Sequence, residues 1–148
     1  MAGRRRHIGD LQGEIQELFA ELWQVPRYSG LRYGFRPQAD CYRTDDPPAL
    51  HVVLELPGVD PAAIEIAVAG RALFVSGTRN RSHAIPGTRY QQMEIDYGPF
   101  QRRIDLAEEI DPSRAEARYD AGMLRIELPL AASPEPRQER VEIEVHLL

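Results

Sequence analysis

The sequence predicts an all-β protein, an antiparallel β-sandwich with an N-terminal amphipathic helical arm and an extended C-terminal tail. Short apolar runs separated by turn residues fill the middle of the chain, a helical stripe precedes them, and a Pro-rich linker with one alternating segment follows them. At 148 residues the chain is long enough for one sandwich but hardly for two domains. We therefore expect a partly helical arm over 1–36, the sandwich over 37–130 and the C-terminal extension over 131–148.

The arm is predicted from apolar residues that recur every three or four positions, with acidic residues off the stripe and Pro26 after its last turn. An isolated helix of this length is marginal in water, so the stripe needs a partner surface. Packing against the chain's own core is the simpler interpretation, and binding to other proteins is the alternative. The stripe consists of Ile8, Leu11, Ile15, Leu18, Phe19, Leu22 and Trp23.

The strands are predicted from β-branched and aliphatic runs that end at turn signals. Residues 50–56 form one such run and stop at Pro57-Gly58, while Ile64, Ile66 and Val68 alternate with less apolar neighbours. Further strands are expected at 72–76, 100–106, 115–119 and 124–128, with a turn at Asp120-Ala121-Gly122 between the last two. Because no helical pattern intervenes, these strands favour an antiparallel sandwich.

The tail begins with Ser133-Pro134-Glu135-Pro136-Arg137, which is typical of an extended linker. Val141, Ile143 and Val145 then alternate with charged or polar residues, as in a strand. A strand must pair its backbone and cover its apolar face. It therefore either closes its own sandwich or adds to a sheet edge elsewhere, and a neighbouring copy is the interpretation that we favour.

The sequence offers little that points to catalysis or to a cofactor. The four histidines are far apart, Cys41 is the single cysteine, and neither a nucleophile elbow nor a phosphate-binding loop occurs. A net charge of −5 argues against nucleic acid as the main partner. No apolar run approaches the ~18 residues of a membrane span, and no apolar run follows the N-terminal arginines. We expect a non-enzymatic, cytoplasmic protein without cofactor, metal or stable membrane insertion.

Five short segments, in order, resemble the signature of the small heat-shock proteins. The likeness covers roughly residues 37 to 145, and each segment is weak evidence alone. The matching segments are Leu56-Pro57-Gly58-Val59, Gly98-x-Phe100-x-Arg102, Leu106 to Pro112, Ala117 to Leu124, and Val141-x-Ile143-x-Val145.

The sequence departs from the family pattern at three positions, where Ala107, Ala121 and Met123 replace the usual Pro, Asn and Val. Gly122, the residue that a tight hairpin with φ > 0 most needs, is retained before Leu124. The substitutions therefore bear on the stability of this turn more than on the fold.

The resemblance implies an immunoglobulin-like α-crystallin domain and an ATP-independent holdase that binds partly unfolded client proteins. Such clients expose apolar surface, and covering it is worth roughly 25 cal/mol per Å². The arm stripe can cover many such surfaces, because hydrophobic attraction is not directional. It is the client-binding surface that the resemblance suggests.

The resemblance also implies homodimers that assemble into higher homo-oligomers. In bacterial and plant members a strand in a long loop crosses to the partner's sheet. The twenty residues between Gly77 and Gly98 are long enough for that, with a strand-like stretch around Tyr90 and Met93. Arg102 matches the family's dimer-supporting arginine. In the tail, Ile143 docks together with either Val141 or Val145, and both options stay open.

Two other functions remain possible on a sandwich fold. A co-chaperone module would bind one folded chaperone partner, although such modules usually lack the hairpin and tail motifs. A carbohydrate-active sandwich would need paired carboxylates, and the bunched Glu108, Glu109 and Asp111 look more like a solvated turn.

Overall fold

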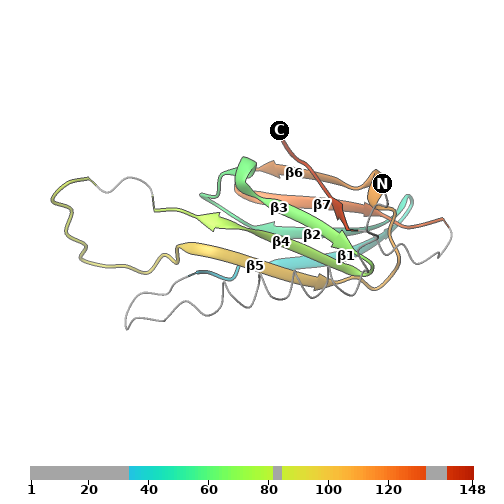
Figure 1. The fold of residues 1–148 in the computed structure, drawn as a ribbon, viewed down its shortest axis with the longest axis horizontal. Coiled ribbons are helices and arrows are strands. Elements are labelled where there is room, and N and C mark those ends of the chain that lie inside the picture. Colours follow the sequence, from blue (N-terminus) through green and yellow to red (C-terminus); the bar gives the residue numbers. More distant parts are fainter. Residues whose placement is uncertain (1–33, 82–84, 133–139) are drawn as a thin grey trace, which may run out of the picture.

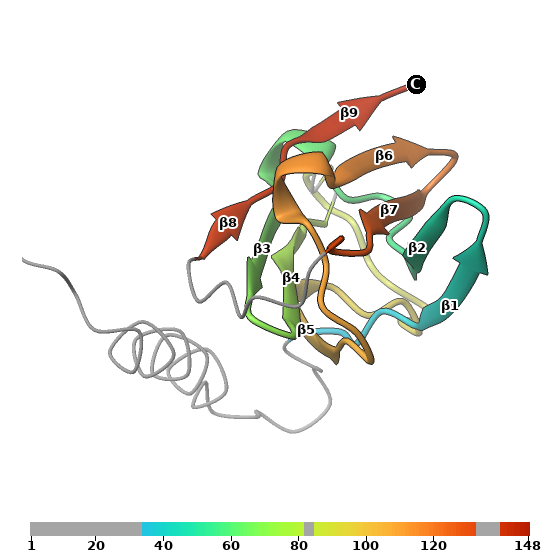
Figure 2. The same ribbon diagram turned by 90° about the vertical axis from the view of Figure 1, so that its right-hand side faces the viewer.

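A computed structural model describes residues 34–81, 85–132 and 140–148 of the protein. These residues form a sandwich of two facing sheets (Figures 1 and 2). One sheet has the order β1-β2-β7-β6-β9 and the other the order β5-β4-β3-β8. The strands are β1 (Ala39–Asp45), β2 (Pro48–Glu55), β3 (Glu65–Ala69), β4 (Ala72–Arg79), β5 (Gly98–Asp105), β6 (Glu116–Asp120), β7 (Met123–Pro129), β8 (Val141–Glu142) and β9 (Val145–Leu147).

The first sheet follows the predicted alternation closely. Leu54 pairs with Leu124 and Val52 with Ile126 across β2 and β7, and all four side chains face the core and are at most 1% exposed. Val53 and Arg125, the pair between them, face outward, as expected where one face of a sheet is buried. Burying such side chains is the main favourable term that holds the two sheets together.

In the second sheet, β4 and β5 pack an aromatic ring directly over a glycine. A Cβ atom placed on Gly77 would lie 2.8 Å from the Phe100 ring, and Gly77 is the register partner of Phe100. Phe100 itself is buried in the core and packs against Phe35, with ring centroids 5.1 Å apart and the rings tilted by 57°. Hence Phe35, which the sequence assigns to the arm, already packs on the sandwich.

Two single-turn 3-10 helices join strands at the edges of the sandwich, η1 (Pro61–Ala63) before β3 and η2 (Pro112–Arg114) before β6. Each begins with a proline and is capped by the preceding aspartate, Asp60 or Asp111, whose carboxylate accepts a backbone N–H. Proline at the first position has no N–H to leave unsatisfied, so both turns are favoured locally.

Strand β1 was not expected from the sequence. Its seven residues pair with β2 over their whole length, yet five of the seven are exposed. An exposed edge strand has no apolar face and therefore no alternating signal. In contrast, the strand-like stretch at 89–95 forms no strand within the described residues.

Candidate assembly interfaces

The described residues contain no grouping of His, Cys, Asp and Glu suited to a metal ion, and no polar or charged residue among them is buried. Cys41 is an exposed residue, but partial burial of its side chain raises the pKa of the thiol. A raised pKa disfavours the reactive thiolate. No helix in the described part is long and apolar enough to cross a membrane. The candidate interfaces are instead the edges of the two sheets and the loop that carries exposed apolar side chains.

The tail lies across the seam between the two sheets of its own chain (Figure 2). Its first strand, β8, pairs antiparallel with β3, where Val141 is opposite Val68. Its second strand, β9, pairs parallel with β6, where Val145 is opposite Ala117. The tail thus extends both sheets at the same edge of the sandwich.

Ile143 is the residue that joins these two short strands. Its side chain is 7% exposed and belongs to the main core cluster, and its N–H donates to the Ile66 carbonyl at 3.0 Å. Val145 also packs against this cluster, whereas Val141 is half-buried and contributes mainly the backbone pairing of β8. Of the two motif versions, Ile143 with Val145 is therefore the pair that fills the core in this arrangement.

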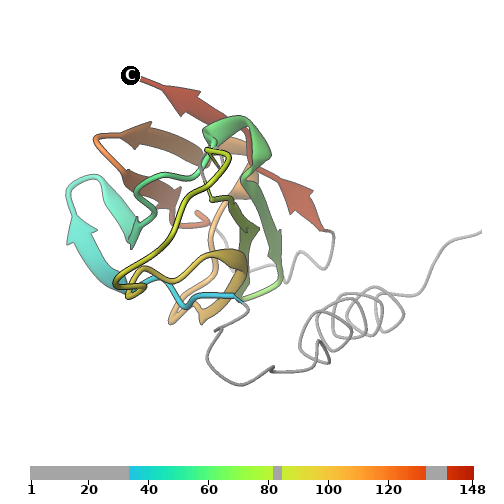
Figure 3. The ribbon, with the colours of Figure 1, turned by 90° about the vertical axis from the view of Figure 1, so that its left-hand side faces the viewer.

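The β4–β5 loop, residues 85–97, extends beyond the end of the sandwich (Figure 1), and in Figure 3 it lies in front of the sheets, toward the viewer. Large apolar side chains along it are open to solvent: Ile85 is 73% exposed, Tyr90 56%, Met93 48% and Ile95 64%. A single exposed apolar residue is ordinary, but a run of them on one loop marks an interaction surface. Tyr90 and Met93, the predicted dimer residues, both lie here.

Arg79, at the end of β4, holds the base of this loop. Its guanidinium donates twice to the Asp96 carbonyl, at 2.9 and 2.6 Å, and lies 3.8 Å from the centre of the Phe35 ring. Arg81 lies over Tyr97 at 4.5 Å in the same way. This cluster was not predicted from the sequence. A usable signal was present, because Arg79 and Arg81 lie two residues apart at one end of the loop and the aromatic Tyr97 lies at the other end.

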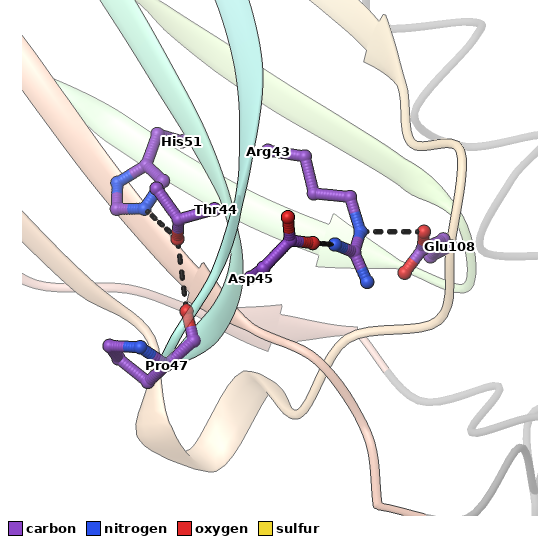
Figure 4. Close-up of polar contacts among 6 residues, drawn as sticks. All are labelled: Arg43, Thr44, Asp45, Pro47, His51 and Glu108. Carbon is purple, nitrogen blue, oxygen red and sulfur yellow. Dashed lines mark hydrogen bonds and ion pairs between the residues drawn. The ribbon is translucent and has the colours of Figure 1, made fainter.

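On the opposite sheet, β1 ends the strand order, and its outer edge pairs with no strand in the ranges that the structure describes. The far end of β1 is fixed by Arg43, which forms ion pairs with Asp45 and, at 2.9 Å, with Glu108 beyond β5 (Figure 4). These pairs are largely exposed, so they orient the strand more than they stabilise it.

The β1–β2 hairpin is closed by a second set of contacts, also drawn in Figure 4. The Thr44 hydroxyl donates to the Pro47 carbonyl at 3.0 Å and lies 2.9 Å from Nε2 of His51, within hydrogen-bond distance. The His51 ring also stacks on Tyr42, with ring centroids 4.8 Å apart. The result is a firmly held edge strand.

Arg102, the predicted dimer arginine, lies on β5 in the same inward-facing row as Val75. Its guanidinium donates to the Pro37 carbonyl at 2.6 Å, just ahead of β1. Burial, together with the neighbouring charge of Arg36, lowers its pKa. Arg102 thus links the second sheet to the segment that leads into β1.

The predicted hairpin turn lies between β6 and β7, at Ala121 and Gly122. Both have positive φ, 49° and 77°, as a two-residue type I′ turn requires. A Cβ on Gly122 would lie 3.0 Å from Pro57 Cα, so the turn also packs too closely for a larger residue. Leu124, which follows it, is fully buried on β7.

The predicted client-binding stripe, Ile8 to Trp23, lies outside the described residues, as does the Pro-rich linker at 133–137. The first described contacts after the arm are backbone hydrogen bonds from Gly34 to Tyr97, at 3.0 Å, and from Phe35 to Pro99, at 3.3 Å. The arm therefore leaves the sandwich beside the start of β5.

Sequence comparison finds relatives over much of the chain. The small heat shock protein C2 of Rickettsia felis is 28% identical over 139 residues, 94% of this chain and 87% of that protein. The 18 kDa heat shock protein of Streptomyces albus G is 36% identical over 90 residues, 61% of this chain and 63% of that protein.

Solved structures share the architecture. A small heat-shock protein from Xylella fastidiosa is 30% identical, with a TM-score of 0.57 over 71% of this chain and 94% of that one. Heat shock protein 16.0 from Schizosaccharomyces pombe has a TM-score of 0.61 over 71% of this chain and 96% of that one, at 24% identity, and so supports the fold alone. The model of the Hsp20/alpha crystallin family matches residues 43–146. The chain belongs to the Hsp20/alpha crystallin family, the family of the small heat-shock proteins.

Proposed function

We propose that this protein is an ATP-independent holdase that acts as dimers assembled into larger homo-oligomers. The observation that carries the proposal is the run of exposed apolar side chains on the β4–β5 loop of a chain in this chaperone family. Such a run is costly for an isolated subunit, because it leaves apolar surface in water without a partner. A second copy of the chain supplies that partner.

The dimer that best uses these features pairs the β4–β5 loop of one subunit with β1 of the other. The loop has the length and apolar residues of a strand but lacks a strand partner among the described residues. β1 has seven residues and an outer edge without a strand partner in that same part of the chain. Backbone pairing along an open edge gives affinity, and side chains such as Tyr90 and Met93 give specificity.

Larger assemblies would form when tails are exchanged between dimers. Ile143 and Val145 occupy the seam of their own sandwich here, and the same seam on a neighbouring copy offers identical contacts. The Xylella fastidiosa relative is described as having a distinct high-order structure, which supports assembly beyond the dimer.

Client binding is assigned to the arm stripe, with Leu18, Phe19, Leu22 and Trp23 at its centre. These side chains can contact partners of no fixed shape, because hydrophobic attraction is not directional. No nucleotide is needed, because covering apolar surface is itself favourable. Aggregation is delayed for as long as that surface stays covered.

The test is suppression of light scattering by an aggregating model enzyme, without ATP, at equimolar subunits. We expect clear suppression by the full chain and weaker suppression after removal of residues 1–33, a cut that spares Phe35. A full chain that fails to suppress scattering would favour the co-chaperone alternative. Equal protection by the truncated chain would move the client site from the arm to the sandwich.

A further inference from the structure

The outer face of the second sheet carries an apolar patch that is separate from the core. In the strand register, Ala67 is opposite Phe74, and Ala69 is opposite Ala72. Between them, Val68 and Leu73 face the core, so these four residues face the other way. We call Ala67, Ala69, Ala72 and Phe74 the outer patch.

The outer patch is shielded from water although it faces away from the core. Ala67 is 7% exposed, Ala69 9%, Ala72 5% and Phe74 8%. Ala69, Ala72 and Phe74 form a hydrophobic cluster of their own, apart from the main core. Outward side chains of a two-layer sandwich are ordinarily solvated, so this face has the character of an interface.

One polar group beside the outer patch lacks a partner. Gln101 lies on β5 opposite Ser76, on the same outward face, and its Oε1 atom is buried without any hydrogen bond in the described part of the chain. A buried acceptor left unsatisfied costs free energy. Whatever covers this face should therefore bring a donor.

We infer that the outer patch is the docking site for the arm stripe of the same chain, residues 8–23. The stripe is an apolar helical face that needs a surface, and the three alanines beside Phe74 leave room for a helix to approach closely. The arm meets the sandwich at Gly34, which is bonded to Tyr97 beside the start of β5, the strand next to β4.

The dimensions agree with this docking. A helix over 8–23 is about 24 Å long, and a strand of eight residues such as β4 spans about 26 Å. The ten residues 24–33 can reach up to about 33 Å, which is enough to place the stripe anywhere on the sheet. The stripe also contains one side-chain hydrogen-bond donor, the indole N–H of Trp23, which can serve Gln101.

Docking of this kind keeps the apolar side chains of the arm stripe bound to the outer patch. This consequence rests on the proposed function, because it assumes that the stripe binds clients. A client would then compete with the outer patch for the stripe, and weakening the patch should increase client capture.

Trp23 is the single tryptophan, so its fluorescence reports the docking in the full chain. We expect a blue-shifted emission and weak acrylamide quenching in the wild type. Phe74→Ser and, separately, Ala69→Arg should shift the emission to the red and raise the quenching constant severalfold. Val53→Ser, on the outer face of the other sheet, should leave both unchanged. Circular dichroism confirms that each variant remains folded. A solvent-exposed Trp23 in the wild type, or one equally protected in both patch variants, would overturn the inference.

The occupant is identified by cross-linking. Leu22→Cys combined with Ala72→Cys, in a Cys41→Ser background, is treated with a short bis-maleimide. Docking in the same chain gives a cross-linked product of monomer mass, whereas a dimer-mass product would assign the patch to a second copy and overturn the inference. Client suppression is measured separately on Phe74→Ser. A red-shifted Trp23 emission in Phe74→Ser without increased client suppression would still support docking of the arm on the outer patch. It would count against the arm as the client-binding site.

Discussion

The tail and the β4–β5 loop are both short segments with recurrent apolar residues, but the structure treats them in opposite ways. Ile143 in the tail is 7% exposed, whereas Ile95 in the loop is 64% exposed. The tail pairs with β3 and β6 of its own chain, whereas the loop pairs with no strand among the described residues. Apolar content alone therefore does not decide which segment becomes buried.

What separates them is which strand edges lie beside each segment. The tail crosses the seam, where it meets an edge of each sheet. The loop is held at both ends by the neighbouring strands β4 and β5, and Arg79 clamps its base to Asp96. It extends past the end of the sandwich (Figure 1), where no strand among the described residues presents an edge to it. This position is the reason that we propose another subunit as the partner of the loop.

The largest expected effect is on the tail. Ile143→Ala with Val145→Ala removes the side chains that hold it in the core, at a cost of about 2–5 kcal/mol for a buried isoleucine. We expect large oligomers to fall to roughly dimer size in size-exclusion chromatography. Leu147→Ala with Leu148→Ala is the matched control, because both residues are at least 70% exposed. An unchanged elution profile of the first variant would refute tail docking as the assembly contact.

The next effect concerns the hairpin beside the tail. Gly122→Val places a β-branched residue at φ 77° and against Pro57, which should cost about 3 kcal/mol or more. Because β9 pairs with β6, the tail should loosen while the loop is unaffected. Ala121→Asn, which tolerates positive φ better, should raise stability by up to about 1 kcal/mol. Thermal unfolding measures both, and an unchanged melting temperature of Gly122→Val would show that this turn is not strained by side chains.

For the loop, Tyr90→Ser with Met93→Ser should weaken the dimer by about 10- to 100-fold in Kd, as loss of two interface anchors does. Both residues are about half exposed in the single chain, so the unfolding of the monomer should not change. Leu148→Ser, which removes an exposed apolar side chain outside the loop, is the control. Sedimentation at several concentrations gives the Kd, and equal values for the two variants would place the dimer contact elsewhere.

The smallest effect is a pH dependence at Tyr119, close to the end of the tail. Its hydroxyl donates to the Leu56 carbonyl at 2.7 Å, and burial raises its pKa, partly offset by the Val59 backbone. A raised pKa favours the neutral phenol in the folded state, so this contribution is present below pH ~10 and is lost above it. Tyr119→Phe should cost about 1 kcal/mol at neutral pH and flatten the alkaline decline. A decline equally steep in that variant would assign it to other groups.

Sequence patterns predicted the buried strands well, because Val52, Leu54, Leu124 and Ile126 alternate where one face of a sheet is covered. They missed β1, whose residues are mostly exposed, and they predicted a strand in the loop, where the described residues form none. The tail was predicted as a strand, but its course over both sheets depends on two edges brought together only by the fold. The spacing of Arg79 and Arg81 could have indicated the cluster at the loop base, but the particular partners of Arg79, Phe35 and Asp96, are brought to it only by the fold.

The route of the tail across the seam has a thermodynamic consequence for assembly. A tail that leaves its own seam and enters that of an identical neighbour breaks and makes the same contacts, so the exchange itself is nearly neutral in contact energy. The balance is then set by the entropy of closing the exchange and by the effective concentration of neighbouring seams. Subunits joined in this way can redistribute among assemblies without an energy source.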